Sequence, residues 1–192
     1  MQNIQIISIN TSEKKGTIKT SVGKAVITPL GVEGDSHAGK WHRQISLLGL
    51  ESYRKVREEH KLELEPGAFA ENLTTEGIQL HHCRPMDRFS AGKLVLEVTQ
   101  IGKKCHSGCE IQKKTGSCIM PLEGIFCRVI SGGELKEGDV LKYHPREIQV
   151  HILTLSDRAA AGEYEDQSGP VAKELLESFF KKQGRVFQTH RS

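Results

Sequence analysis

Short runs in which apolar and polar residues alternate recur along most of the chain. Alternation with a period of two, combined with β-branched residues, is typical of strands that bury one face. Glycine, proline or aspartate separates most of these runs, as turns require. Several short strands at such spacing predict a mainly β fold, a barrel with few helices. The expected strands cover residues 4–9, 24–28, 44–48, 72–75, 94–101, 125–130 and 140–143.

One helix is expected within this β-rich part, over residues 51–59. Residues of opposite charge, such as Glu51 and Lys55, stand four positions apart there and therefore face each other on successive turns. Tyr53 and Val56 supply the apolar edge that such a helix needs in order to pack on a core.

The pattern changes after Pro145. Residues 148–155 form a nearly continuous apolar run, which is typical of a strand buried on both faces. Ser168 precedes Pro170, and this combination predicts a helix with a serine cap and an early proline. Gly184 is placed to end that helix before another short strand begins.

Two domains are therefore predicted. Residues 1–145 form the barrel, and residues 146–192 form an incomplete α/β segment in which a helix joins two parallel strands. The unpaired edge of that small sheet, together with an apolar stripe on its helix, leads us to expect docking on the barrel or homo-oligomerisation through this segment. The stripe consists of Val171, Leu175, Leu176 and Phe179.

Charge and composition restrict the classes of partner. Lys plus Arg number 27 against 24 Asp plus Glu, and a net charge of +3 is too small a bias to favour binding to nucleic acid. The first residues do not resemble a secretory signal, and no apolar run approaches the length of a membrane span, so we expect a cytoplasmic protein without a membrane partner. Cytosolic thiols stay reduced, so the 5 cysteines are interpreted as thiols or metal ligands.

The densest candidate chemistry follows the strand expected at residues 94–101. Cys105 is flanked there by Lys103, Lys104 and His106. Nearby cations stabilise a thiolate and lower the pKa of the thiol, so Cys105 is predicted to be nucleophilic. The same cations would attract phosphate or oxyanion groups, including a pterin phosphate or molybdate.

Two other interpretations of this segment remain open. Cys105 could be a small buried residue, because free cysteine is among the most buried residue types. Alternatively Cys105, His106, Cys109 and Cys118 could hold zinc, and the protein would then be a zinc-stabilised scaffold that brings other proteins together, although their spacing does not match the paired ligands of common zinc sites. Cys127 lies in an apolar run and is expected in the core.

Two further segments carry candidate binding residues. Asp35, His37 and Arg43 lie in or beside a glycine-containing loop, where backbone can approach a ligand closely and arginine can present several donors to a phosphate. Glu71 and Asn72 follow a Pro-Gly turn. Each group has an equally good structural interpretation, in which its residues simply form turns or satisfy local hydrogen bonds.

Taken together, these segments resemble the MOSC domain, named from the C-terminal domains of molybdenum cofactor sulfurases. The resemblance covers about residues 1–144 and rests on Gly34-Asp35-x-His37-x-Gly39, residues 43–48, residues 69–73, residues 92–98 and the thiol after Gln100. It implies a compact β-barrel that carries or transfers sulfur, through a cysteine that falls on Cys105. The extra thiols Cys109 and Cys118 leave open which cysteine carries the sulfur.

The resemblance also implies the ligand and the partners. Members that bind the molybdenum cofactor (molybdopterin) do so through the same cysteine, so Cys105 is expected to be either a persulfide carrier or a molybdenum ligand. The cofactor-binding candidates are Lys103, Lys104, His106, Arg43, His37, Asp35, Glu71 and Asn72, with Cys109 and Cys118 as further metal-ligand candidates. A pyridoxal-phosphate cysteine desulfurase is the expected sulfur donor, and molybdenum cofactor enzymes are the expected recipients. Zinc is not expected, and a carrier of this kind need not itself be an enzyme.

The C-terminal segment is similar to a second family. Residues 150–170 resemble the opening of MogA/MoaB proteins, which bind molybdopterin and transfer adenylyl groups. In that family the glycine-rich and acidic motifs that hold the cofactor come later than the part represented here. We therefore expect no adenylyltransferase activity from residues 146–192.

Overall fold

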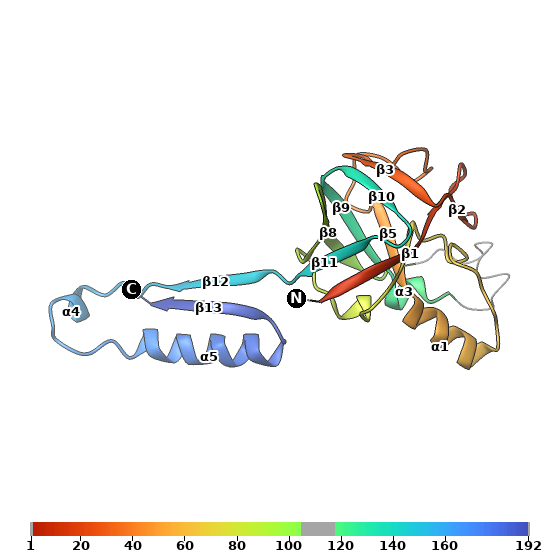
Figure 1. Cartoon of the computed structure of the whole chain (residues 1–192). Helices are drawn as coiled ribbons and strands as arrows, with labels where there is room; N and C mark the ends of the chain where they lie inside the picture. Colours follow the sequence, from red (N-terminus) through yellow and green to blue (C-terminus); the bar gives the residue numbers. More distant parts are fainter. Residues whose placement is uncertain (1, 105–117, 192) are drawn as a thin grey trace. The chain divides into compact units, whose positions relative to one another are not determined.

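The protein, described by a computed structural model over residues 2–104 and 118–191, divides into two compact units. Unit 1 is Met1–His144 and unit 2 is Pro145–Ser192. Figure 1 shows a barrel in unit 1, whereas unit 2 is a single layer of two strands with one long helix beside it. Each unit is described separately below.

Unit 1 is a closed barrel of 7 strands in the order β1-β11-β7-β8-β9-β5-β6, with β6 pairing back to β1. The predicted mainly β fold is confirmed. Its strands are β1 Asn3–Thr11, β5 Ile45–Gly49, β6 Leu73–Glu76, β7 Arg88–Ala91, β8 Leu94–Ile101, β9 Ile125–Ser131 and β11 Val140–His144. Four further strands among the described residues of unit 1 lie outside the closed ring, namely β2 Thr20–Ser21, β3 Lys24–Thr28, β4 Gly31–Val32 and β10 Gly133–Lys136.

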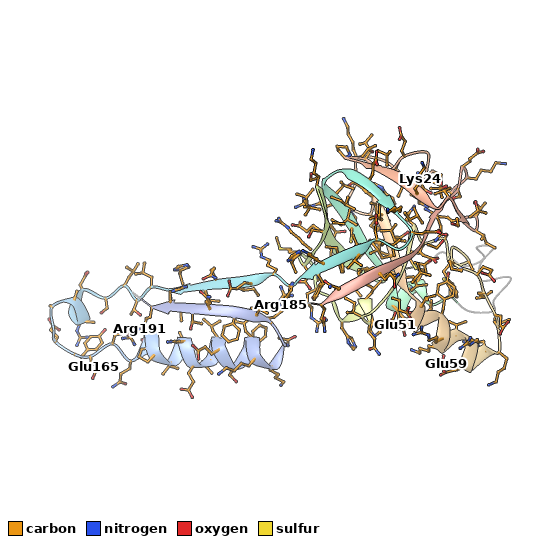
Figure 2. The ribbon with its side chains drawn as sticks, in the orientation of Figure 1. Lys24, Glu51, Glu59, Glu165, Arg185 and Arg191 are labelled. Carbon is orange, nitrogen blue, oxygen red and sulfur yellow. The ribbon has the colours of Figure 1, made fainter. Side chains whose placement is uncertain are left out.

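The barrel interior is filled by the apolar positions of the alternating runs. In β1, Ile4 and Ile6 are buried, whereas Asn3 and Gln5, which alternate with them, are exposed. This alternation is the pattern that predicted the strand. Long charged side chains such as Lys24 on β3 instead lie at the surface (Figure 2). The fully buried side chains of the interior include Ile27, Leu47, Leu73, Phe89, Leu96, Cys127 and Leu141.

The strands β5 and β6 form the parallel pair of the barrel, in the register Leu47↔Leu73. They are joined through α1, Leu50–His60, which confirms the helix expected at residues 51–59. On the other side of β5, Ser46 pairs with Phe126 of β9. The backbone N–H of Asn72 donates to the carbonyl of Ser46 at 2.9 Å. Ser46 of β5 therefore lies between β9 on one side and the residue before β6 on the other.

A second apolar cluster lies between α1 and the outside of the barrel. It includes Leu48, Tyr53, Val56, Phe69, Met120 and Phe126. The rings of Tyr53 and Phe69 meet edge to face, with centroids 5.1 Å apart. The short helices α3, Met120–Glu123, and η1, Leu80–His82, complete the helical part of unit 1 among the described residues. Three members of this cluster, Phe69, Met120 and Phe126, also line the cavity described below.

Unit 2 is a βαβ arrangement. Its strands β12, Glu147–Ile152, and β13, Val186–Arg191, pair in parallel, and α5, Ser168–Lys182, lies along one face of the pair (Figure 1). The short helix α4, Asp157–Ala160, lies in the connection. The rings of Phe180 on α5 and Phe187 on β13 are 5.5 Å apart, which fixes the helix against the strands.

Two details of the prediction for this unit are wrong. The apolar run does not continue as a strand buried on both faces, because β12 ends at Ile152 and Leu155 is 85% exposed. A sheet of two strands with a helix on one side can cover only one face. Nor does Ser168 cap the helix: Asp166 Oδ1 accepts hydrogen bonds from the backbone N–H groups of Ser168 and Gly169, at 2.9 and 3.2 Å.

No helix among residues 2–104 and 118–191 combines the length and the apolar character needed to cross a membrane.

Candidate functional site

A cavity of about 410 Å³ brings most of the candidate residues together. We call it the basic cavity. Its walls come from segments far apart in the sequence: the loop after β1, the loop before β5, the beginning of β5, the turn before β6, the segment after β8, and the residues from Cys118 into β9. The lining residues are Lys15, Gly16, His37, Trp41, Arg43, Ser46, Phe69, Ala70, Asn72, Lys103, Lys104, Cys118, Met120 and Phe126.

The charge of the basic cavity is strongly one-sided. Lys15, Arg43, Lys103 and Lys104 each contribute a cation, and no carboxylate is present among the described lining residues. A concave surface lined by positive charges concentrates the electrostatic field and attracts anions. The lining therefore favours a ligand that carries phosphate or oxyanion groups.

Arg43 is the most informative member of this lining. Its Nε is buried and has no hydrogen-bond partner among the described residues. Its guanidinium carbon lies 4.9 Å from the centroid of Trp41 and 5.7 Å from that of Phe126. A buried donor without a partner costs about 1–3 kcal/mol, and an anionic ligand would recover that free energy. The aromatic rings provide apolar surface beside the same charge.

Local hydrogen bonds hold the segment that carries Arg43. The indole Nε1 of Trp41 donates to the carbonyl of His37 at 2.9 Å. The side chain of Gln44 donates to the carbonyl of Gly39 at 3.0 Å and accepts from the backbone of Val129 at 2.7 Å. These contacts fix Arg43 between two anchored neighbours, so its side chain is presented from a defined backbone.

Asn72 lies at the wall of the basic cavity, as a binding residue would, and it also has a structural role. Its Oδ1 accepts from both the backbone and the hydroxyl of Ser46, each at 3.1 Å. Its Nδ2 donates to the carbonyl of Asn10 at 3.3 Å. Asn72 therefore ties β1, β5 and β6 together at the point where Ser46 and Asn72 reach the cavity.

Glu71 is fully buried and is absent from the lining of the basic cavity. Its Oε1 accepts from Tyr53 Oη at 2.6 Å, from the backbone N–H of Gly67 at 2.7 Å and from Thr74 Oγ1 at 2.6 Å. Burial raises the pKa of this carboxyl above its ordinary value, although the hydrogen bonds oppose the shift. These contacts give Glu71 a structural role in the turn after Pro66, whereas its buried Oε2 has no hydrogen-bond partner among the described residues, so the role of Glu71 in binding stays a prediction.

Asp35 is likewise buried and lies outside the lining. Its carboxylate pairs with Lys19 at 2.7 Å and accepts from the backbone N–H of His37 at 3.0 Å. Burial alone would raise the pKa of Asp35, but hydrogen bonds from His37 and Lys19 outweigh it and hold the pKa well below its usual range. Asp35 is therefore a charged residue beneath the loops, whereas His37 reaches the cavity itself.

The predicted thiol segment is described only at its two ends. Lys103, Lys104 and Cys118 line the basic cavity, whereas Cys105, His106 and Cys109 lie outside the described residues. Within the described ranges no cluster of three or more His, Cys, Asp or Glu side chains could hold a metal ion. The zinc interpretation depends mainly on those three residues, so it stays untested.

The other two thiols are structural. Cys127 is fully buried in the barrel, as expected, and burial raises its pKa well above the ordinary value. Cys83 is also buried, and burial raises its pKa to about 12. Neither thiol forms an appreciable amount of thiolate near neutral pH, so neither is a candidate nucleophile.

Several lining residues were not singled out from the sequence. Lys15 and Gly16 lie in a polar loop with no motif of its own, and Phe69 and Phe126 look like ordinary core residues. Trp41 differs from these residues, because the sequence does distinguish it. It is the single tryptophan of the chain and stands two positions before Arg43, a candidate phosphate-binding residue.

Two larger hollows, of about 610 Å³ each, lie elsewhere on unit 1. One is lined by Lys24 and Lys136 together with Glu33, Glu134 and Asp139, so its charges largely compensate. The other shares Glu134 and Asp139. Neither includes a candidate residue from the sequence, and size alone does not make a site. The smaller basic cavity is the better candidate.

Comparison with known proteins places the chain in a family. The sequence model of the MOSC domain matches residues 34–142, more than half of the chain. The chain belongs to the MOSC domain family. Membership supports a role related to the molybdenum cofactor, with which this family is associated. The matched region contains most of the basic cavity, including His37, Arg43, Asn72 and Lys104.

Solved structures support the same fold. The YUAD protein from Bacillus subtilis is similar with a TM-score of 0.65 at 17% identity, covering 74% of this chain and 96% of that one. YiiM from Geobacillus stearothermophilus gives 0.59 at 24% identity, with 74% and 76% coverage. YiiM from Escherichia coli gives 0.52 at 22% identity, with 76% and 71% coverage. Among curated proteins, none matches the sequence.

Proposed function

We propose that the protein binds the molybdenum cofactor in the basic cavity and carries sulfur for it as a persulfide on Cys105. The observation that carries this proposal is the buried, unpartnered Nε of Arg43 in a cavity with four cations and, over the described lining, no carboxylate. Such a lining fits the phosphate of a pterin cofactor, and the rings of Trp41 and Phe126 fit its flat ring system. Cys105 follows the cavity residue Lys104 directly in the chain.

The sulfur-loading step needs only a thiolate and a persulfide donor. The thiolate of Cys105 attacks the outer sulfur of a persulfide on a pyridoxal-phosphate cysteine desulfurase. The S–S bond of the donor breaks, the donor cysteine leaves as thiolate, and a new S–S bond forms on Cys105. The neighbouring Lys103 and Lys104 stabilise the attacking thiolate, and His106 does so when it is protonated. Sulfur changes carrier, and no net oxidation occurs.

Incubation of the protein with a cysteine desulfurase and cysteine, followed by mass spectrometry, tests this step. We expect one added sulfur in the wild-type protein and in Cys118→Ala, and none in Cys105→Ala. Loss of loading in Cys118→Ala with loading retained in Cys105→Ala would assign the carrier role to Cys118. Equal loading of all three proteins would exclude both Cys105 and Cys118 as the carrier, and Cys109→Ala would then test the remaining thiol of this segment.

A second candidate function uses the same cavity differently. In it, the protein holds the cofactor permanently and Cys105 ligates molybdenum. The volume of about 410 Å³ is within the ordinary range for small-molecule sites, so it suits a permanently held cofactor as well as a transiently bound one. Metal and pterin analysis of protein purified from molybdate-supplied cells separates the two functions. A permanent binder carries molybdenum and pterin in equal amounts, whereas a carrier contains neither.

For unit 2 we propose a resemblance to the opening of MogA/MoaB proteins. The parallel βαβ arrangement supports the resemblance. We also propose that its exposed apolar stripe associates with a second copy. Val171, Leu175 and Phe179 are each more than half exposed on α5. Sedimentation of Leu175→Glu against wild type tests this association.

A further inference from the structure

A buried ion pair between Lys19 and Asp35 lies outside the basic cavity, among the loops that form it. Lys19 Nζ is 2.7 Å from Asp35 Oδ1 and 2.8 Å from Oδ2. The exposed fractions of the two side chains are 0% and 1%. Burying a lysine and an aspartate is costly even when they pair, and apolar replacements of similar pairs are often neutral or stabilising. A stable fold alone therefore does not explain this pair.

The pair joins the loop after β1 to the loop before β5. Asp35 Oδ1 accepts from the backbone N–H of Ser12 at 3.1 Å, and Asp35 Oδ2 accepts from that of His37 at 3.0 Å. The backbone N–H of Ser36 also donates to the carbonyl of Ser12 at 2.8 Å. The first loop brings Lys15 to the basic cavity, and the second brings His37, Trp41 and Arg43.

The same pair contacts a third wall of the cavity. The backbone N–H of Lys19 donates to the carbonyl of Gly67 at 3.0 Å. The approach is so close that a Cβ on Gly67 would overlap the Lys19 carbonyl. Gly67 begins the turn that carries Phe69, Ala70 and Asn72 to the cavity. Three of the cavity-forming segments thus meet at one buried pair.

Lys19 and Asp35 do not themselves touch the space of the cavity, since neither belongs to its lining. Their charges cancel, so the pair adds little to the field that attracts an anion. The pair can therefore affect binding only through the positions in which it holds the two loops.

We propose that Lys19 and Asp35 are positioning residues, which set the spacing of Lys15 and Arg43 that anion binding in the basic cavity requires. The proposal rests on the proposed ligand site in this cavity and goes beyond it by assigning two residues that the ligand does not touch. Because Lys19 and Asp35 are 16 positions apart, the pair fixes one loop relative to the other and does not merely stiffen one turn.

The full chain offers a direct optical readout of the site. Trp41 is the single tryptophan, it lies in the cavity wall, and its ring contacts the guanidinium of Arg43. Its fluorescence therefore reports binding when the protein is titrated with inorganic phosphate, which serves as the probe ligand. Thermal unfolding of the same samples measures stability independently.

The decisive variant is Lys19→Met with Asp35→Asn. Lys19→Met alone leaves an unpaired buried carboxylate and is expected to be strongly destabilised, whereas the double variant removes both charges and recovers most of that loss. It also leaves the net charge near the cavity unchanged. We expect the double variant to bind phosphate roughly tenfold or more weakly than wild type, because small misplacements of binding groups have large effects. Acrylamide should also quench Trp41 differently from wild type.

The control is Arg54→Gln with Glu76→Gln, which also removes one positive and one negative charge, from an ion pair outside the cavity lining. It should bind phosphate as wild type does. If the double variant of Lys19 and Asp35 does not fold, Asp35→Asn alone provides the test. In Asp35→Asn, Lys19 can lose its proton and so avoid being an unpaired buried charge, because burial already lowers its pKa.

Wild-type affinity in a folded variant of the pair would overturn the positioning role and leave the proposed function intact. If phosphate does not bind to the wild-type protein, the anion site of the proposed function and the positioning role are both wrong. If Lys19→Met loses both stability and phosphate affinity, and the double variant regains both, the pair has only a structural role.

Discussion

The guanidinium of Arg43 lies over the ring of Trp41, with its carbon 4.9 Å from the ring centroid. This contact aligns a cation with an aromatic face at the wall of a cavity that has no carboxylate among its described lining residues. It therefore joins the two features that a flat, phosphate-bearing ligand requires. It also makes the arginine difficult to replace by another cation.

Arg43→Lys should weaken phosphate binding about tenfold, although the charge is retained. Lysine lacks the planar group that lies over Trp41 and lacks the buried Nε donor, and bidentate or stacked arginines are not replaced well by lysine. Titration followed by Trp41 fluorescence measures the effect. Arg54→Lys on the exposed side of α1 is the control and should bind as wild type does. An unchanged affinity in Arg43→Lys would show that only net charge matters.

Gly67→Ala should destabilise unit 1 by roughly 3 kcal/mol. The new Cβ would overlap the carbonyl of Lys19, which is backbone and cannot rotate away, and the residue has a φ of +89°. Gly138→Ala is the matched control, because φ is +87° there and nothing lies within 4 Å of a Cβ. It should cost only about 1 kcal/mol for the left-handed conformation. Equal losses in chemical denaturation would mean that the contact with Lys19 is not restrictive.

Glu71 should make stability depend on pH near and above its ordinary pKa of 4.5. Its folded pKa is raised, so its contribution is fully present below the unfolded pKa and is lost as pH rises towards the folded pKa. The stability of wild type relative to Glu71→Gln should therefore fall as pH increases from about 4.5. Urea denaturation of both proteins across this range provides the measurement, and a difference independent of pH would contradict it.

Thiol labelling should separate the cysteines into two groups. In the folded protein at neutral pH, iodoacetamide should leave Cys83 and Cys127 unmodified, because both are buried and their thiols have raised pKa values. Cys105 is predicted to react first. Unfolding in urea should make all 5 cysteines reactive. Rapid modification of Cys127 in the native protein would contradict the burial that the barrel gives it.

The strands of unit 1 were predictable because they follow a simple rule. Residues 3–6 alternate between polar and apolar side chains, and β1 begins there with the same alternation of exposed and buried positions. Residues 148–152 also alternate, because Gln149 and His151 separate Ile148, Val150 and Ile152. The prediction of a strand buried on both faces gave too little weight to these polar positions, and Leu155 was expected inside but is exposed.

The site was predictable only in part, for a related reason. Arg43 and Lys104 could be selected because their chemistry is visible in the sequence, and both line the cavity. Lys19 gave no signal, since an isolated lysine is almost always solvated. Glu71 had two equal interpretations, and its contacts with Tyr53 and Gly67 establish only the structural one.

The closure of the barrel has a consequence for how the chain folds. β1 pairs with β11 in the register Asn3↔Lys142, so the first and last strands of unit 1 lie side by side. A ribosome must therefore release almost all of unit 1 before this seam can form, and contacts between such distant residues slow folding. Until then β1 has an open edge available to other chains, which makes nascent or shortened forms of the protein prone to aggregation.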